Sequence, residues 1–188
     1  PALSKDILYT TDLLDNILHW SRSQLKGYGL KRQFFDLKTL VVNEVNYHLP
    51  SAKLKNIEII QDVFPGSTVY ADMIMIEIVV RNILNNAIKF CPPGCRIQIS
   101  SVYKDQFIKL SVANDGDGIS KDMINTLFNG QNQSTRGTMN EKGTGLGLVV
   151  CKDFIERNFG RLTVESELGL STTFNIHLPV DKPDAELE

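Results

Sequence analysis

One stretch of the chain carries polar side chains suited to a magnesium–phosphate site. In "RNILNNAIKF", residues 81–90, a helix turning 100° per residue places Asn82, Asn86 and Lys89 within about 60° of one another. An asparagine oxygen suits Mg²⁺, which usually keeps several waters and substrate phosphate oxygens. Lys89 adds a positive charge for phosphates, and Phe90 can lie against an aromatic base. The same spacing also fits a solvated helix face whose asparagines make local hydrogen bonds.

A glycine-containing turn follows in "VANDGDGIS", residues 112–120. Gly116 and Gly118 allow a close backbone approach or a positive φ. A buried acceptor just before them, at Asn114, can receive a hydrogen bond from an amino group such as that of adenine. A plain tight turn after a strand accounts for the two glycines as well.

A third glycine-rich stretch is "EKGTGLGLVV", residues 141–150. Its glycines, Gly143, Gly145 and Gly147, run into a helix whose free N–H groups and dipole favour an anion. The spacing differs from the Walker phosphate loop, which needs a Lys–Ser/Thr pair after its last glycine. The alternative is a helix start crowded against another element.

The elements that must position these motifs follow from hydrophobic periodicity and from turn residues. They predict an α+β fold: a two-layer α/β sandwich with a mixed, mostly antiparallel sheet, about three helices on one face, and an additional N-terminal helix over residues 5–26. Helices are predicted from the Asp36 cap to about 54, with a bend at Pro50, and over 72–90, 120–127 and 144–160; strands over 57–63, 68–72, 96–103, 106–114, 161–167 and 171–179. The polar segment 129–143 has the length of a functional lid.

Composition narrows the class of protein. The 188 residues are 42% hydrophobic and 22% charged, which indicates a globular chain, and a net charge of −2 argues against a nucleic-acid partner. No apolar run reaches the roughly 20 residues of a membrane helix, so we expect no membrane contact by this part of the protein. Cys91, Cys95 and Cys151 are expected as free core thiols in a cytoplasmic protein, and four ligands at zinc spacing are missing.

Taken together and in this order, the three motifs resemble the nucleotide-binding blocks of the GHKL superfamily, specifically the sensor histidine kinases. "NILNNAIKF" is similar to the N box, "NDGDGI" to the first glycine box, Leu127–Phe128 to the F box and "GTGLGL" to the second glycine box. The resemblance covers about residues 36–180 and implies an ATP-binding sandwich of the Bergerat type, with 129–143 as the ATP lid.

The resemblance implies roles residue by residue, with ATP and Mg²⁺ as cofactors. Asn86 would bind Mg²⁺ with Asn82 assisting, and Asn82 and Lys89 would serve catalysis. The other expected nucleotide contacts are Phe90, Asn114, Gly116, Gly118, Ile119, Phe128, Lys142, Gly143, Thr144, Gly145, Leu146, Gly147, Leu148, and Thr172 or Thr173 at the pocket floor.

Two asparagines set this chain apart from related patterns. ATP-hydrolysing relatives resemble this block but carry a glutamate at the place of Asn82, where it acts as a general base. An amide cannot accept that proton, so bound ATP is expected to be spared for transfer to a histidine. Asn114 replaces the usual aspartate, and its neutral oxygen can still accept a hydrogen bond from adenine, without the help of a charge.

"LLDNILHWSRSQ" resembles the second helix of the dimerisation and phosphotransfer hairpin of these kinases. The predicted organisation is therefore residues 1–28 for that helix, 29–180 for the ATP-binding catalytic domain and 181–188 for a disordered tail. The resemblance implies a protein-histidine kinase of two-component signalling, homodimeric through the hairpin, with a response regulator receiver domain as partner. His19 lacks the neighbours of a phosphoacceptor, so we expect the acceptor histidine to lie outside this chain.

A second reading is a degenerate nucleotide-binding module that signals by dimerisation or partner docking, without phosphoryl transfer. Asn86, Lys89 and the glycines argue against it, and Asn114 argues for it. An ATP hydrolase is disfavoured by Asn82, and a serine kinase of the anti-sigma type by the helix at 5–26.

Overall fold

The computed structural model describes residues 30–129, 136–141 and 145–183. The chain divides into two compact units, 1–30 and 31–188, and nearly all described residues belong to the second. The helix predicted over residues 5–26 and most of the predicted tail lie outside the described residues.

A five-stranded sheet forms one layer of the second unit, in the order β2-β4-β5-β7-β6. Its strands are β2 (Glu58–Asp62), β4 (Arg96–Lys104), β5 (Phe107–Asp115), β6 (Arg161–Glu167) and β7 (Ser171–Pro179). β2 pairs with β4 in parallel and all other neighbours are antiparallel, so the mixed, mostly antiparallel sheet is confirmed.

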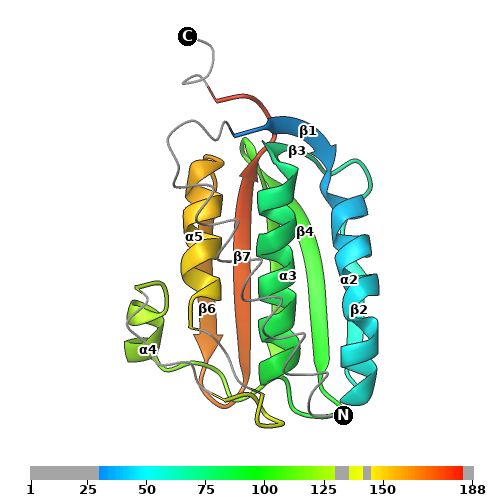
Figure 1. The fold of residues 1–188 in the computed structure, drawn as a ribbon, viewed down its shortest axis with the longest axis vertical. Coiled ribbons are helices and arrows are strands. Elements are labelled where there is room, and N and C mark those ends of the chain that lie inside the picture. The colour runs from blue at the N-terminus through cyan, green and yellow to red at the C-terminus, as the bar shows by residue number, and fades with distance from the viewer. Residues whose placement is uncertain (1–29, 130–135, 142–144, 184–188) are drawn as a thin grey trace. The chain divides into compact units, whose positions relative to one another are not determined.

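Three helices cover one face of this sheet, as predicted (Figure 1): α2 (Leu37–Leu54), α3 (Met73–Phe90) and α5 (Gly147–Arg157). The short α4 (Lys121–Thr126) lies apart from them, beyond the β6 edge. Alternate residues of the central strands are buried beneath the helices, among them Ile108, Leu110 and Val112 on β5. This alternation is what places one face of each strand in the core.

Two features of the strands differ from the prediction. β1 (Arg32–Asp36) was not expected, and it pairs with β3 (Thr68–Asp72) in a separate two-stranded antiparallel sheet. The residues of β1 are half-buried or exposed and do not alternate between buried and exposed positions. Without that alternation, the sequence of β1 carries only a weak strand pattern. The strand at 68–72 was predicted correctly, but its partner could be found only from the fold.

Aspartates begin the two long helices. The Asp36 carboxylate accepts from the N–H groups of Lys38 and Thr39, and Asp72 accepts from those of Ile74 and Met75. Such N-caps satisfy donors that have no partner within the helix. Both helices therefore begin where the sequence predicted, and α2 continues through Pro50 to Leu54.

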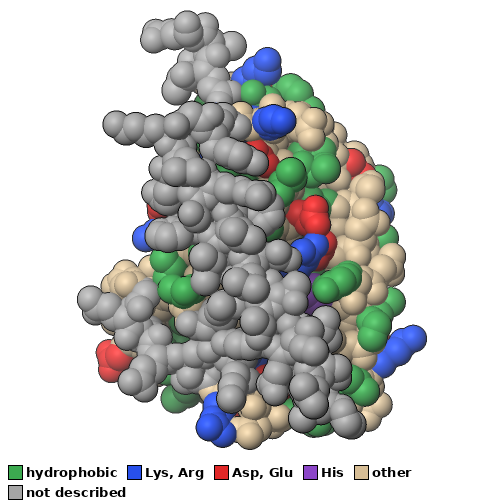
Figure 2. Space-filling model, in the orientation of Figure 1, with side chains coloured by type: hydrophobic (Ala, Val, Ile, Leu, Met, Phe, Trp, Pro, Cys, Tyr) green, Lys and Arg blue, Asp and Glu red, His purple; other side chains and the backbone are tan. Residues whose placement is uncertain are grey.

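α2 and α3 are joined by an ion-pair network. Glu44, only 4% exposed, receives two hydrogen bonds from the Arg81 guanidinium, at 3.2 and 3.1 Å. Arg81 also pairs with Glu77 at 2.6 Å. Acidic, basic and histidine side chains accordingly meet over α2 and α3 in Figure 2. Such pairing and hydrogen bonding offset part of the cost of burying a carboxylate.

The cysteines behave in two ways. Cys151 is a buried free thiol, as the sequence predicted, and burial raises its pKa. Cys91 and Cys95, with Cα atoms 6.0 Å apart, are joined as a disulfide across "CPPGC". The prediction of free thiols is therefore wrong for this pair, because the turn through the two prolines brings the side chains together.

Candidate nucleotide site

The first polar motif lies on α3, along the margin of its buried face. Asn82, Asn86, Lys89 and Phe90 are all half-buried, between the fully buried Ile83 and Ala87 and the exposed Asn85. The Asn82 amide nitrogen donates to the carbonyl of Ile78 at 3.0 Å, which orients its oxygen away from the helix. The bond to Ile78 is a local hydrogen bond of the kind that the alternative reading predicts, whereas the half-buried position of Asn82 and Asn86 sets them apart from the exposed Asn85.

The Asn82 oxygen faces the start of α5. A Cβ atom added to Gly147 would lie 3.0 Å from Asn82 Oδ1, closer than nearly all real Cβ contacts. Any side chain at position 147 would therefore crowd Asn82. This brings the first and third motifs together, although more than sixty residues separate them in sequence.

The N-cap residue of α5 supplies no capping side chain. Gly145 adopts a positive φ of 73°, and Leu146, in the cap position, makes no side-chain capping hydrogen bond. The helix begins at Gly147, later than the predicted residue 144. The N–H groups in the first turn of a helix, which here includes Leu148, have no acceptor within the helix and favour an anion. Lys142, Gly143 and Thr144 lie outside the described residues.

The glycine turn after β5 lies against the C-terminal end of α3. A Cβ atom on Gly116 would lie 3.0 Å from the Phe90 carbonyl oxygen and 3.2 Å from the Asn114 amide nitrogen. Gly118 has φ of 68°, and a Cβ atom there would overlap the carbonyl of Glu167. Close approach of a neighbouring chain segment favours glycine at position 116, and at position 118 both the overlap with Glu167 and the positive φ require it.

Asn114 is 5% exposed and lies on the helix-facing side of β5. Its amide nitrogen donates weakly to the Asp115 carbonyl at 3.3 Å. In the sheet register Asn114 is opposite Thr172, which is also buried, whereas Thr173 is opposite Ala113. Because side chains alternate along a strand, Thr172 shares the face of Asn114 and Thr173 points to the other face. Of the two threonines, only Thr172 is placed for the pocket floor.

Ser166 on β6 connects this floor to the turn, although no sequence motif indicated it. Its hydroxyl lies 2.8 Å from Thr172 Oγ1 and accepts from the N–H of Ile119 at 2.8 Å. It also donates to the Ser171 carbonyl at 2.6 Å. These bonds tie the predicted Ile119, through Ser166, to the start of β7. Phe128, by contrast, lies just after α4 and is half-buried.

Two further residues, Lys55 and Glu141, affect the charge of Lys89 at the end of α3, and neither was indicated by the sequence. Burial lowers the pKa of Lys89, against the attraction of the Glu141 carboxylate, and the Lys55 ammonium lowers it further. The Lys89 ammonium lies 4.6 Å from the centre of the Phe90 ring. Lys89 is therefore a half-buried cation next to an aromatic ring, which suits a site for a phosphorylated aromatic base.

The residues fit Mg²⁺ bound together with phosphates better than a resident metal ion. Within the described ranges, histidine, cysteine and carboxylate side chains form no cluster of three that could hold a metal. Asn82 and Asn86 offer neutral oxygens, and a Mg²⁺ ion held by them would need oxygens from water and phosphate to complete its shell.

Residues 71–182 match the family described as histidine kinase-, DNA gyrase B- and HSP90-like ATPase. The match covers more than half of the chain and includes all three motifs. The chain belongs to this family. Membership in the histidine kinase-like ATPases confirms the resemblance inferred from the N box and the two glycine boxes.

Curated relatives of this ATPase domain are sensor kinases. The adaptive-response sensory kinase SasA of Synechococcus elongatus (strain ATCC 33912 / PCC 7942 / FACHB-805) is 38% identical over 129 residues, covering 67% of this chain and 33% of SasA. The sensor protein EvgS of Escherichia coli O157:H7 is 33% identical over 180 residues, covering 90% of this chain and 14% of EvgS. The chain thus spans a third or less of these two relatives.

Solved structures of histidine kinases share the fold of this ATPase domain. The catalytic domain of histidine kinase ThkA has a TM-score of 0.70 at 25% identity, covering 79% of this chain and 95% of that one. Full-length ShkA in complex with AMPPNP has a TM-score of 0.76 at 26% identity, covering 93% and 36%. The α+β sandwich is therefore that of a histidine kinase catalytic domain.

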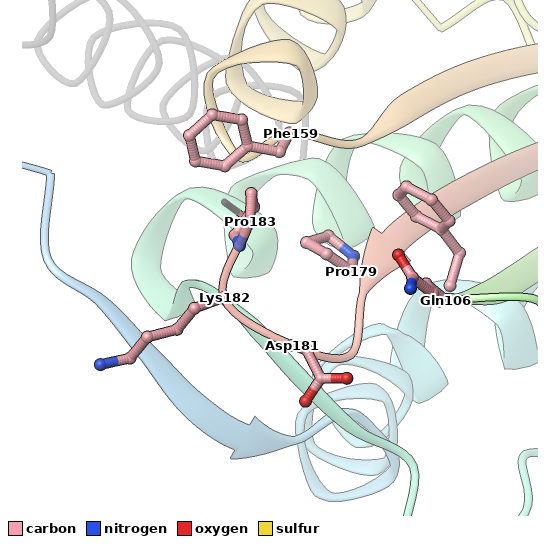
Figure 3. A pocket seen from close by; sticks show the side chains of 7 residues that line it. Gln106, Phe159, Pro179, Asp181, Lys182 and Pro183 are labelled. Carbon is pink, nitrogen blue, oxygen red and sulfur yellow. The ribbon is translucent and has the colours of Figure 1, made fainter. Parts of the chain in front are cut away.

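A cavity of about 260 Å³ lies elsewhere on this histidine kinase-like domain (Figure 3). Phe159 borders it just beyond the C-terminal end of α5, whereas the candidate site adjoins the N-terminal end of that helix. Its lining residues are Gln106, Phe107, Phe159, Pro179, Asp181, Lys182 and Pro183. None of the predicted site residues contributes to it, so the cavity does not identify the nucleotide site.

Proposed function

We propose that residues 29–180 bind Mg-ATP and position its γ-phosphate for transfer to a histidine outside this chain. The observation that carries the proposal is the convergence of three separate segments. The Asn82 oxygen faces the start of α5 at Gly147, and the Phe90 carbonyl faces the glycine turn at Gly116. The proposed magnesium ligand Asn82, the helix start proposed to bind phosphate, and the glycine turn proposed to contact the adenine thereby lie along one edge of α3.

Each residue has a role in this proposal. The Asn86 oxygen, assisted by Asn82, would hold Mg²⁺, and Lys89 would contact phosphate oxygens. Asn114 and Thr172 would form the floor against the adenine, with the amide oxygen of Asn114 accepting from the adenine amino group. The backbone N–H groups at Gly145–Leu148 would bind phosphates, together with Lys142 and Gly143 at the end of the lid over 129–143 and Thr144 just after it. Bound Mg²⁺ would supply charge neutralisation of the phosphates.

Phosphoryl transfer is favoured over hydrolysis because position 82 is an amide. An asparagine cannot accept a proton from water, so it cannot serve as a general base. Transfer to histidine depends on positioning and charge stabilisation, which Asn86, Lys89 and the α5 N-terminus can provide. We therefore expect ATP to remain intact on the isolated chain.

The organisation of the whole protein is also a proposal. Because the relatives are sensor kinases, we infer that residues 1–28 are the second helix of the dimerisation hairpin, through which the intact kinase forms a homodimer. The receiver domain of a response regulator would then accept the phosphoryl group from that histidine. The ATP-binding domain itself would act in the cytoplasm. No helix in the described part of the chain is long and apolar enough to span a membrane.

One observation favours the second reading, a nucleotide-binding module without transfer. Asn114 is buried and uncharged where the family pattern has an aspartate, so the bond to adenine lacks a charge. Nucleotide binding and transfer must therefore be measured separately.

Isothermal titration with Mg-ATP tests binding, and a transfer assay tests catalysis. We expect binding that requires Mg²⁺, no label on the chain itself from γ-labelled ATP, and label on a second chain that carries the phosphoacceptor hairpin of the complete kinase. Absence of binding would reject the proposal. Binding without labelling of the hairpin would support the degenerate module, and stable labelling of this chain would show that an acceptor lies within it.

A further inference from the structure

Lys55 follows the last turn of α2, and its side chain is 4% exposed. Lysine is almost never buried to this extent without partners. The Lys55 ammonium has four: it donates to the carbonyls of Ile88 at 2.8 Å and Lys89 at 3.0 Å, and to Thr138 Oγ1 at 2.8 Å. It also pairs with Glu141 Oε1 at 2.5 Å.

The first two partners are carbonyl groups in the last turn of α3. Carbonyls in the last turn of a helix accept no hydrogen bond from an N–H group of the same helix. The negative end of the helix dipole also favours a cation there. Lys55 therefore caps the turn that carries Lys89. The Gly94 N–H donates to the Lys55 carbonyl at 2.8 Å, which fixes the backbone of Lys55 beside the same turn.

The other two partners belong to segment 136–141, which packs over this turn. The Thr138 N–H donates to the Lys89 carbonyl at 3.0 Å, and the Thr138 hydroxyl lies 2.9 Å from the Cys91 carbonyl. A Cβ atom on Gly137 would overlap both a Glu141 carboxylate oxygen and the Lys89 side chain. Segment 136–141 thus lies directly on Lys89.

Glu141 is close to both lysines. Its carboxylate pairs with Lys55 and also attracts the Lys89 ammonium. A carboxylate in this position would repel a phosphate if Lys55 did not compensate its charge. It would also draw Lys89 toward itself and away from the phosphate.

We propose that Lys55 is a positioning residue for the phosphate contact of Lys89: it caps the turn that carries Lys89 and compensates the charge of Glu141. This inference rests on the proposed Mg-ATP site, because it acts through Lys89. It assigns no contact between Lys55 and the nucleotide itself.

The test compares Lys55→Met with Lys53→Met, which removes an exposed lysine from the last turn of α2. Mg-ATP affinity is measured by calorimetry, adenosine affinity by NMR titration, and folding by thermal unfolding. We expect Lys55→Met to weaken Mg-ATP binding by about tenfold or more, as for an uncompensated charge near a bound ion. Adenosine binding is expected to change by less than about twofold because it has no phosphates, and Lys53→Met is expected to match wild type.

Rescue separates charge compensation from a purely structural role. In the double variant Lys55→Met/Glu141→Gln no carboxylate is left uncompensated, so Mg-ATP affinity should return to within about threefold of wild type. If Lys55→Met does not fold, Lys55→Gln replaces it, since its amide can still donate to one α3 carbonyl without a charge.

The outcomes are distinguishable. If wild type does not bind Mg-ATP, the proposed function fails. If wild type binds and the uncharged Lys55 variant binds equally well, only this inference fails. Equal weakening of Mg-ATP and adenosine, or a double variant no better than the single one, would also overturn it, because Lys55 would then support the fold without acting on the phosphate contact.

Discussion

The first turn of α3 and its last turn are stabilised by different kinds of side chain. At the first turn, the Asp72 carboxylate accepts from Ile74 and Met75, and the Asp72 N–H donates to the oxygen of Asn158 at 2.7 Å. At the last turn, the carbonyls of Ile88 and Lys89 accept from the Lys55 ammonium, which pairs with Glu141. Both turns are anchored by a residue far away in sequence.

The difference lies in where the charges are placed. At the first turn, the distant residue that anchors Asp72 is the neutral Asn158. Asn158 is fully buried and also donates to the Phe154 carbonyl at 2.8 Å. The last turn brings two ammonium groups and a carboxylate next to the proposed phosphate site. Substitutions at the first turn should therefore change stability, and substitutions at the last turn should change nucleotide binding. Four predictions test this contrast.

The largest effect is expected for Asn86→Ala, one turn before Lys89. Loss of the proposed magnesium ligand should reduce phosphoryl transfer to the hairpin chain by about a hundredfold or more, roughly 3 kcal/mol of transition-state stabilisation. Thermal stability should remain close to wild type. The matched control is Asn85→Ala, an exposed asparagine on the same helix. Equal transfer rates for the two variants would remove Asn86 from the site.

Asn158→Ala tests the first turn. It leaves the half-buried Asp72 N–H without its acceptor and removes the fully buried Asn158 amide, so the free energy of unfolding should fall by about 2 kcal/mol in urea titrations. Mg-ATP affinity, measured well below the unfolding temperature, should stay within about twofold of wild type. A large loss of affinity at unchanged stability would show that the two ends of α3 are not separable.

Asn114→Asp adds the charge that the family pattern has at the glycine turn. We expect Mg-ATP to bind more tightly by about 1–2 kcal/mol, because the hydrogen bond from the adenine amino group becomes charge-assisted. The double variant Asn114→Asp/Asp115→Asn keeps the net charge of the chain and should show the same gain in calorimetry. No gain in either variant would indicate that the pocket is adapted to the neutral amide.

The smallest effect is expected from acid titration of Glu141. Burial alone would raise its pKa, but hydrogen bonds from Lys55 and from the Met139 N–H outweigh this, and the pKa is lowered. A lowered pKa in the folded state means that Glu141 stabilises the fold above its unfolded pKa, about 4.3. This contribution is lost as the pH falls below that value and through the folded pKa.

Urea titrations of wild type and Glu141→Gln between neutral pH and about pH 3 measure this contribution as a difference in unfolding free energy. Because the Glu141 side chain is 32% exposed, we expect at most about 1 kcal/mol at neutral pH, decreasing toward zero in acid. A difference that grows in acid would contradict the assigned direction of the shift.

The sequence alone determined the described helices, nearly all of the strands, and the residues along the margin of α3. These rest on local signals: the Asp36 cap, the apolar stripe of α3, the alternation of β5 and β7, and glycines that end or begin elements. Each signal spans only a few positions, so it can be read without knowing what packs against it. The order of the three motifs then indicated the family.

Only the tertiary structure decided which residues meet. It joined β1 to β3, selected Thr172 over Thr173 through the register with Asn114, and linked Cys91 to Cys95. It also brought Lys55 to Glu141, 86 positions away, and Ser166 to Ile119. A polar residue at a helix end or on a strand looks the same in sequence whether it faces solvent or a buried partner. Its role is fixed by long-range packing, which periodicity and capping do not encode.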